Sequence, residues 1–323
     1  MRDLILQTLK QERHISGQEL GKRLNISRTA IWKHINELRS RGYQIDSSPK
    51  SGYSFIKSTE LLLPEEIGSG LNTQIMGKHV KHYYEVSSTQ DVAAELARGG
   101  AADGTLVIAE MQKEGRGRKG RSWVSFPEGG IYLSLILRPN LLPSQIVQVP
   151  LIAGVAVVKA IKDIIPLQPA IKWPNDIIIG EKKVGGILTE MNCEVDGINF
   201  VVLGIGLNVN IPASSLTEPT IGIATSLIEE HGAYISRVKL VQCFLIEFEM
   251  IYKKFMAYGF SSVRNEWKTL NNTLGVRVKV NDGGKETKGQ AIDIDNDGFL
   301  LVRSNSGTVH RIISGDVTIT RRV

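Results

Sequence analysis

Residues 115–123, GRGRKGRSW, place four cationic side chains and three glycines in nine positions. The stretch lies between two strand-like runs, TLVIAEM and IYLSLILR. It matches neither GxxxxGK followed by Ser or Thr nor GxGxxG, and no apolar helix follows it, which excludes a P-loop and a Rossmann turn. Because guanidinium groups form charge-assisted hydrogen bonds with anions, we expect a flexible loop that orders over an anionic ligand. The alternative is a solvated basic loop.

A second polar stretch, KWPNDIIIGEKKVGGILTEM, occupies residues 172–191. Its Trp-Pro-Asn-Asp sequence predicts a tight turn between the apolar run AIKW and the strand IIIG. A hairpin turn follows, and then Lys183, Gly185 and Gly186. Trp-Pro-Asn-Asp is an unusual choice for a plain turn, which favours a functional role for this segment.

The composition predicts a globular protein of two or three domains, because 323 residues with 42% hydrophobic side chains can bury a sizeable core. The longest apolar run, residues 150–158, is shorter than the ~20 residues of a membrane span. The first nine residues lack the pattern of a signal peptide, so we expect a cytoplasmic protein that does not associate with membranes. Cys193 and Cys243 have no CxxC partner, which favours two buried thiols over a disulfide or a zinc site.

Positive charge is concentrated at the start of the chain. Residues 1–60 carry 11 Lys and Arg against 6 Asp and Glu, a net charge of +5 out of +6 for the whole chain. This asymmetry predicts a polyanionic partner for the first segment.

The same segment has the pattern of a helix-turn-helix. Ser16 and Glu19 predict a capping box, and Ser27 predicts the N-cap of a second helix with apolar residues at helical spacing. YQIDSSPKSGYSFI then predicts two strands joined by a basic turn, the wing of a winged helix. The residues expected to contact DNA are Arg28, Thr29, Trp32, Lys33, Asn36 and, at phosphate, Lys50. The alternative is a small helical domain whose polar face is only solvated.

The pattern along the chain predicts four segments and an α+β fold class. Residues 1–60 form the winged helix-turn-helix domain, and residues 61–79 form a linker. Residues 80–272 alternate strand-like and helical runs, which predicts a mixed sheet layered with helices. Residues 273–323 contain short strands with the hairpin signals NDGG and DNDG, which predicts a small β-barrel.

The chain resembles the biotin protein ligases, in their bifunctional form with a DNA-binding domain in front. The resemblance rests on the motifs above together with SST at residues 87–89, Gln112 and GIGLNVN at residues 204–210. The resemblance covers essentially the whole chain, and GRGRxxRxW with KWPND is highly specific as a pair. It implies a central domain of the biotin/lipoate ligase type and an SH3-like C-terminal β-barrel. It also implies that MgATP and biotin react to biotinyl-5′-adenylate, from which biotin passes to a lysine.

The resemblance assigns roles to individual residues. Biotin is expected to contact Ser88, Thr89, Gln112, Gly115, Arg116, Arg118, Lys183 and Gly186. ATP and the adenylate are expected to contact Arg118, Arg121, Trp123, Asn175, Asn208, Ala224 and Arg311. Electrostatic catalysis is expected from Arg116, Arg118, Lys172 and Lys183, because a carboxylate and a phosphate meet only if cations offset their repulsion. Asp176 is expected to hold Mg²⁺ through its carboxylate.

Three of these assignments have structural alternatives. Trp123 could be a core aromatic residue, Asp176 a turn residue bonded to its own backbone, and Asn208 part of a β-bulge. Residues 210–227 are expected to form the loop over adenine. This loop lacks a tryptophan found in one branch of the family, and Ile223 is the large apolar residue nearest to the position of that tryptophan.

The implied partners are a biotin carboxyl carrier protein, of acetyl-CoA or pyruvate carboxylase, and operator DNA. One helix-turn-helix reads one half-site, so specific binding requires a homodimer and a palindromic operator. If biotinyl-5′-adenylate binds the dimer-competent form more tightly, linkage makes it a corepressor. Two alternatives stay open: a lipoate or octanoate ligase with an appended regulator, and a ligand-sensing repressor without ligase activity.

Overall fold

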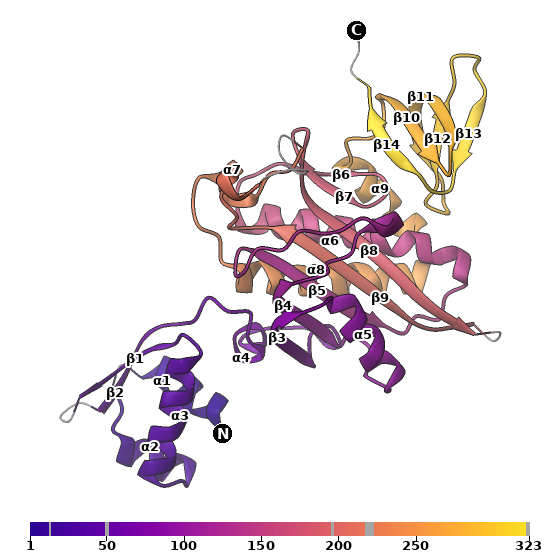
Figure 1. Ribbon diagram of the computed structural model, residues 1–323. Helices are drawn as coiled ribbons and strands as arrows, with labels where there is room; N and C mark the ends of the chain where they lie inside the picture. The colour runs from indigo at the N-terminus through magenta and orange to yellow at the C-terminus, as the bar shows by residue number, and fades with distance from the viewer. Residues whose placement is uncertain (13, 49–51, 195–196, 217–222, 321–323) are drawn as a thin grey trace. The chain divides into compact units, whose positions relative to one another are not determined.

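The computed structural model describes residues 1–323 apart from residues 13, 49–51, 195–196, 217–222 and 321–323 (Figure 1). The chain divides into two compact units, Met1–Glu65 and Glu66–Val323. The segment predicted as a winged helix-turn-helix lies in the first unit. The segments predicted as the catalytic and C-terminal domains share the second.

The first unit packs three helices against a two-stranded antiparallel sheet. Its elements are α1 (Arg2–Gln11), α2 (Gly17–Leu24), α3 (Arg28–Ser40), β1 (Gln44–Ser48) and β2 (Gly52–Lys57). The hydroxyl of Ser16 accepts the Glu19 amide at 3.0 Å, but the Glu19 carboxylate bonds Arg23 rather than returning to Ser16. Only half of the predicted capping box forms, because an ion pair one turn away competes for the carboxylate. Ser27 caps α3 as predicted.

The second unit is built on a seven-stranded sheet in the order β3-β4-β5-β9-β8-β7-β6. The strands are β3 (Val80–Val86), β4 (Leu106–Gln112), β5 (Gly130–Leu137), β6 (Pro169–Lys172), β7 (Asp176–Ile179), β8 (Lys182–Glu194) and β9 (Gly197–Asn208). The β3–β4 pair is parallel, and the other pairs are antiparallel.

Helices cover both faces of this sheet (Figure 1). The helices and 3₁₀ turns of the unit are α4 (Pro64–Gly68), α5 (Thr89–Arg98), η1 (Arg118–Gly120), η2 (Pro143–Gln148), α6 (Val149–Ile164), η3 (Ala213–Ser215), α7 (Leu227–His231), α8 (Arg237–Tyr258) and α9 (Ser261–Leu270). Helix α5 packs on Ile136 and Val202, which lie on the same strand faces as Ser134 and Gly204. The stretch Pro143–Ile164 is long and apolar enough to cross a membrane, but 72% of its apolar 18-residue window is buried inside the protein, as in a core helix.

The C-terminal part is a five-stranded antiparallel sheet in the order β13-β12-β11-β10-β14. Its strands are β10 (Arg277–Asp282), β11 (Lys285–Ile294), β12 (Leu300–Arg303), β13 (Val309–Ile312) and β14 (Asp316–Ile319). Alternate residues such as Val278, Val280 and Val302 are buried, which explains the period-2 pattern of the sequence. The predicted α+β class is confirmed.

The two cysteines differ in exposure. Cys243 is half-buried on α8, and burial raises the pKa of its thiol. Cys193 is exposed, so the prediction of two buried thiols is wrong for this residue. Cys193 lies at a register shift between β8 and β9, close to the end of β8, where the hairpin is no longer covered by the core.

One buried carboxylate fixes the segment that leads into the sheet. Glu249, on α8, accepts the backbone amides of Gln74, Ile75 and Met76 at 2.7–3.0 Å and pairs with Lys253. Burial alone would raise the pKa of Glu249, but the Lys253 ammonium and the three amides outweigh it and lower the pKa to about 2. The ionised carboxylate therefore stabilises the fold.

We expect Glu249→Gln to lower the free energy of unfolding at pH 7 by about 2–3 kcal/mol, since each unit of pKa shift corresponds to about 1.4 kcal/mol. A depressed pKa stabilises the protein above the unfolded-state pKa and loses that effect as pH falls toward about 2. The stability difference from wild type should therefore shrink below about pH 5. Urea unfolding at pH 7 and pH 3 checks this, and a difference independent of pH would contradict it.

Candidate active site

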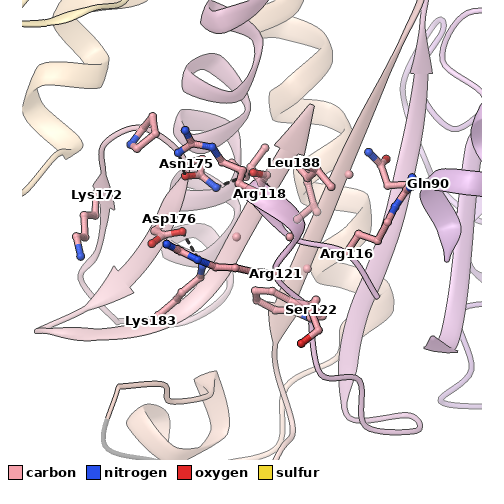
Figure 2. Close-up of a pocket in the computed structure, with 18 of the residues that line it drawn as sticks. Gln90, Arg116, Arg118, Arg121, Ser122, Lys172, Asn175, Asp176, Lys183 and Leu188 are labelled. Carbon is pink, nitrogen blue, oxygen red and sulfur yellow. Dashed lines mark hydrogen bonds and ion pairs between the residues drawn. The ribbon is translucent and has the colours of Figure 1, made fainter. Parts of the chain in front are cut away.

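A pocket of about 340 Å³ opens on the sheet face that α5 covers (Figure 2). Its floor is formed by Gly186 and Leu188 of β8 and by Gly204 and Gly206 of β9. The N-terminus of α5, the Gly-Arg loop (residues 113–129), the turn between β6 and β7 and part of β14 form its walls. The polar segments quoted from the sequence thus meet at one place.

The floor glycines make room for two side chains. A Cβ on Gly206 would lie 2.5 Å from Cε2 of Trp123, and a Cβ on Gly204 would lie 2.8 Å from the amide oxygen of Gln90. Both distances are shorter than real contacts, so a side chain at Gly206 would displace the Trp123 ring, and one at Gly204 would displace the end of the Gln90 side chain. The glycines of GIGLNVN therefore reflect close packing across the pocket floor.

One end of the pocket carries a buried hydrogen-bond network. The Thr89 amide and hydroxyl donate to the Gln112 side-chain oxygen at 2.8 and 3.1 Å. The Ser134 hydroxyl lies 2.9 Å from both the Thr89 hydroxyl and the Gln90 amide oxygen. Ser88 caps α5 by accepting the Gln90 amide. The predicted Ser88, Thr89 and Gln112 thus form one polar group at the α5 N-terminus.

At the other end, the Gly-Arg loop meets the Trp-Pro-Asn-Asp turn. Arg118 Nη1 donates to Asn175 Oδ1 at 2.8 Å, and Asn175 is fixed by bonds with the Ile187 backbone. Burial lowers the pKa of Arg118 from its usual value. The turn forms as predicted, since the backbones of Lys172 and Asp176 are opposite each other where the antiparallel strands β6 and β7 meet it.

Most cations of the pocket are already paired with carboxylates. Arg116 bonds Asp91 at 2.9 Å and Glu190 at 2.8 Å. Lys183 Nζ lies 2.7 Å from the Asp176 carboxylate (Figure 2). From the C-terminal sheet, Asp316 pairs with Arg121 and with Lys119. An anionic ligand would therefore have to replace these carboxylates as the partner of the cations.

Lys172 and Trp123 complete the predicted residues that line the pocket. Lys172 also lines the pocket and has no ion-pair partner among the described residues, and Figure 2 shows it apart from Lys183. Trp123 lies over the floor glycines with Lys183 Nζ 5.5 Å from its ring. Its indole nitrogen is buried without a hydrogen-bond partner in the described structure.

Four predicted residues lie outside the lining of the pocket. Gly115 is buried next to Gln112, where a Cβ would lie 2.4 Å from the Trp123 carbonyl oxygen. Asn208 is buried and donates to the Thr225 carbonyl, and Ala224 bridges to Lys183 through the backbone. Arg311 pairs with Asp295 and Asp297 on the C-terminal sheet and stacks over Phe299. Ile223, which lies within the loop expected over adenine, is exposed.

Sequence reasoning missed several lining residues. Gln90, which directly follows SST, is one of them. Glu190, the partner of Arg116, lies two positions after Leu188 and four after Gly186, so strand periodicity could have placed it on the same face of β8. No local signal marks Asp316, which reaches the pocket from another sheet.

The pocket offers a cation such as Mg²⁺ few protein ligands. Within the described part of the chain, no group of three or more His, Cys, Asp or Glu could hold a metal ion. Mg²⁺ is commonly held by one or two carboxylates together with substrate phosphates, and Asp176 beside Arg118 and Lys183 fits that mode.

In the first unit, the residues predicted to contact DNA lie on one face of α3. Arg28, Thr29, Trp32 and Lys33 are exposed, and Asn36 is half-buried. Lys50 lies outside the described residues. An exposed indole among cations on a helix that follows a tight turn is a surface suited to the major groove.

Comparison with known proteins agrees with this organisation. Residues 2–54 match a family model described as HTH domain, residues 83–209 match the biotin/lipoate A/B protein ligase family, and residues 273–319 match the biotin protein ligase C terminal domain. The bifunctional ligase/repressor BirA of Bacillus subtilis is 41% identical over 94% of both chains. This chain belongs to the biotin protein ligase family.

More distant ligases show the same relationship. The bifunctional ligase/repressor BirA of Escherichia coli is 28% identical over 94% of this chain and 92% of its own. A solved structure of the biotin protein ligase from Aquifex aeolicus in complex with biotin and ATP has a TM-score of 0.65 and 30% identity, covering 76% of this chain and all of that one. The family membership predicted from the motifs is confirmed.

Proposed function

We propose that this chain is an ATP-dependent biotin protein ligase and a biotin-responsive transcriptional repressor. The observation that carries the ligase proposal is one pocket that holds a buried polar group, Ser88, Thr89 and Gln112, together with five cations, three of which are paired with carboxylates. The first suits the ureido group of biotin, and the second suits a carboxylate and phosphates.

In the first half-reaction, a carboxylate oxygen of biotin attacks the α-phosphorus of ATP. The new carbonyl–oxygen–phosphorus linkage forms as the bond to the β-phosphate breaks, and pyrophosphate leaves. The substrate supplies its own nucleophile, so the protein contributes positioning and charge. Arg118 and Lys183 face the same space as Asp176, and Arg116 and Lys172 line the same pocket, so these four cations are our candidates for stabilising the transition state.

The other predicted residues fit roles in binding. Ser88, Thr89 and Gln112 would hold the biotin head, and Gly186 would leave room for its tail. Asn175, Arg121 and Trp123 would contact the adenylate. Mg²⁺, held by Asp176 and the phosphates, would neutralise phosphate charge. The roles proposed for Ala224 and Arg311 require contacts beyond the present lining of the pocket.

In the second half-reaction, the neutral amine of a carrier-protein lysine attacks the acyl carbon, an amide forms, and AMP leaves. The test is to incubate the protein with biotin, MgATP and a biotin carboxyl carrier domain, and to map the label by mass spectrometry. We expect one biotinylated lysine. A carrier with that lysine changed to arginine is the control, and labelling that is unaffected by this change would contradict the proposal.

The repressor proposal rests on α3 and its exposed face. We expect a dimer bound to biotinyl-5′-adenylate to bind a palindromic operator, with the adenylate as corepressor. Operator affinity measured with and without biotin and ATP tests the coupling. Equal affinities would show that the adenylate does not act as corepressor.

Operator affinity should also depend strongly on salt, because cationic side chains displace counterions from the phosphates. Arg28→Ala should weaken operator binding by about 10- to 100-fold and have less effect on random-sequence DNA, as expected for a residue that reads bases. Gel-shift titrations at several salt concentrations measure both effects. Equal losses on both DNAs would reassign Arg28 to phosphate contact.

A further inference from the structure

Helix α5 carries two members of the buried polar group at the end that faces the pocket. Ser88 is its N-cap, and Thr89 is its first residue. Beyond the first turn, the residues that the helix buries are Ala93 and Ala97. An alanine methyl offers few atoms to interlock with the sheet, so this face resists sliding of the helix along its axis only weakly. The position of α5 therefore depends on what holds its two ends.

The side chain of Arg138, directly after β5, binds the C-terminal end of α5. Its guanidinium donates to the Ala97 carbonyl at 2.7 Å, to the Ala101 carbonyl at 2.9 and 3.0 Å, and to the Asn199 carbonyl at 3.1 Å. Its backbone amide donates to the Asp103 carboxylate at 3.0 Å. One side chain thus joins the end of the helix, the turn that follows it and the start of β9.

Arginine suits this place chemically. The carbonyls at a helix C-terminus carry partial negative charge, and a guanidinium presents its donors in a rigid plane with fixed directions. Arg138 is exposed, so water competes for these bonds and reduces their contribution to the free energy of unfolding. Their directions still determine where the helix end lies relative to β5 and β9.

The N-terminal end of α5 is held by groups that a ligand would also use. The Thr89 amide and hydroxyl donate to the Gln112 side chain. In the proposed function, these groups hold the head of biotin, so binding exchanges bonds at this end of the helix. Arg138 does not line the pocket, and its bonds are the same before and after a ligand enters.

We propose that Arg138 is a positioning residue for biotin binding, because it fixes α5 along its axis and so places Ser88 and Thr89. The proposal rests on the ligase function given above. Without the guanidinium, the C-terminal end of α5 loses its bonds to the neighbouring strands, and the hydrogen-bonding groups at the other end move out of line with the biotin head. The Gly-Arg loop and the turn between β6 and β7, which carry most of the cations, are separate elements and keep their places.

The test measures biotin affinity by isothermal titration calorimetry without ATP, and KM for ATP in pyrophosphate release at saturating biotin. Arg138→Met keeps most of the stem but removes every side-chain donor, and Arg138→Lys keeps the charge without the planar fork. We expect Arg138→Met to raise Kd for biotin by about 10-fold, as for the loss of one or two well-aligned hydrogen bonds. Arg138→Lys should lie between Arg138→Met and wild type, and KM for ATP should change little in either variant.

Hydrogen exchange gives a second readout, at the helix end that Arg138 does not touch. The amides of residues 87–93 should exchange faster in Arg138→Met than in wild type, while those of β8 should exchange at the same rate. Unchanged exchange at residues 87–93 would contradict transmission along the helix.

Arg98→Met is the matched control. Arg98 lies in the last turn of α5, is exposed, and has no hydrogen-bond or ion-pair partner among the described residues. This variant removes the same charge from the same helix end, and Kd for biotin should stay close to that of wild type.

Three results would overturn the proposal. The first is an unchanged Kd for biotin in both Arg138 variants, and the second is an equal loss in Arg98→Met, which would assign the effect to charge alone. The third is an equal loss of ATP binding, which would indicate general loosening. A wild-type protein that binds no biotin would instead overturn the ligase proposal, and the role of Arg138 with it.

Discussion

Changing Arg118 to glycine is expected to release biotinyl-5′-adenylate about 10- to 100-fold faster, while the adenylate still forms, but more slowly because one of the four candidate catalytic cations is lost. Arg118 is half-buried and donates to Asn175 from the Gly-Arg loop, so it joins that loop to the turn that carries Asp176. Removing it takes away a charge-assisted hydrogen bond and one cation from the phosphate end of the pocket. Adenylate that escapes would acylate lysines indiscriminately.

The measurement is the rate at which labelled adenylate leaves the protein, with non-specific labelling of an added bystander protein as a second readout. Lys119→Gly is the control, since Lys119 lies in the same loop, is exposed, pairs with Asp316 rather than with the turn and does not line the pocket. It should accelerate release less than Arg118→Gly does. Unchanged adenylate retention in Arg118→Gly would show that the loop is not an anion clamp.

The second large effect is expected at Lys183. Lys183→Met keeps most of the length of the side chain but removes the ammonium that lies 2.7 Å from Asp176. Loss of one preorganised charge at a developing anion costs about 10²- to 10³-fold in kcat, so we expect adenylate formation to fall by that factor. Asp176 also loses its partner, which adds repulsion toward the phosphates.

Single-turnover pyrophosphate release separates this effect from product release. Lys182→Met is the matched control, because Lys182 is the preceding residue on β8, is exposed and does not line the pocket. Its rate should stay close to that of wild type. If Lys183→Met and Lys182→Met gave equal rates, Lys183 would have no special role in the chemistry.

Local signals in the sequence predicted local structure both in the first unit and at the pocket. The caps at Ser16 and Ser27, the turn at residues 173–176 and the loop at residues 115–123 depend on neighbours a few positions away. Each formed because turn residues and N-caps act within a few residues of their own position.

The partners of the cations could not be predicted in the same way. Arg116 meets Glu190, 74 positions away, and Arg121 meets Asp316, 195 positions away. These contacts depend on strand order and on how two sheets pack, which periodicity does not specify. Likewise, GIGLNVN marked β9, but the close packing of Trp123 on Gly206 appears only when the Gly-Arg loop folds over the sheet.

The most direct test of the ligase proposal is mass spectrometry of the ligands retained by the purified protein after incubation with MgATP and biotin, with lipoate in parallel. We expect retained biotinyl-5′-adenylate with one pyrophosphate released for each adenylate, and no adenylate with lipoate. Biotin bound without adenylate would leave a repressor that only senses biotin. An adenylate formed with lipoate alone would contradict the assignment of biotin as the substrate.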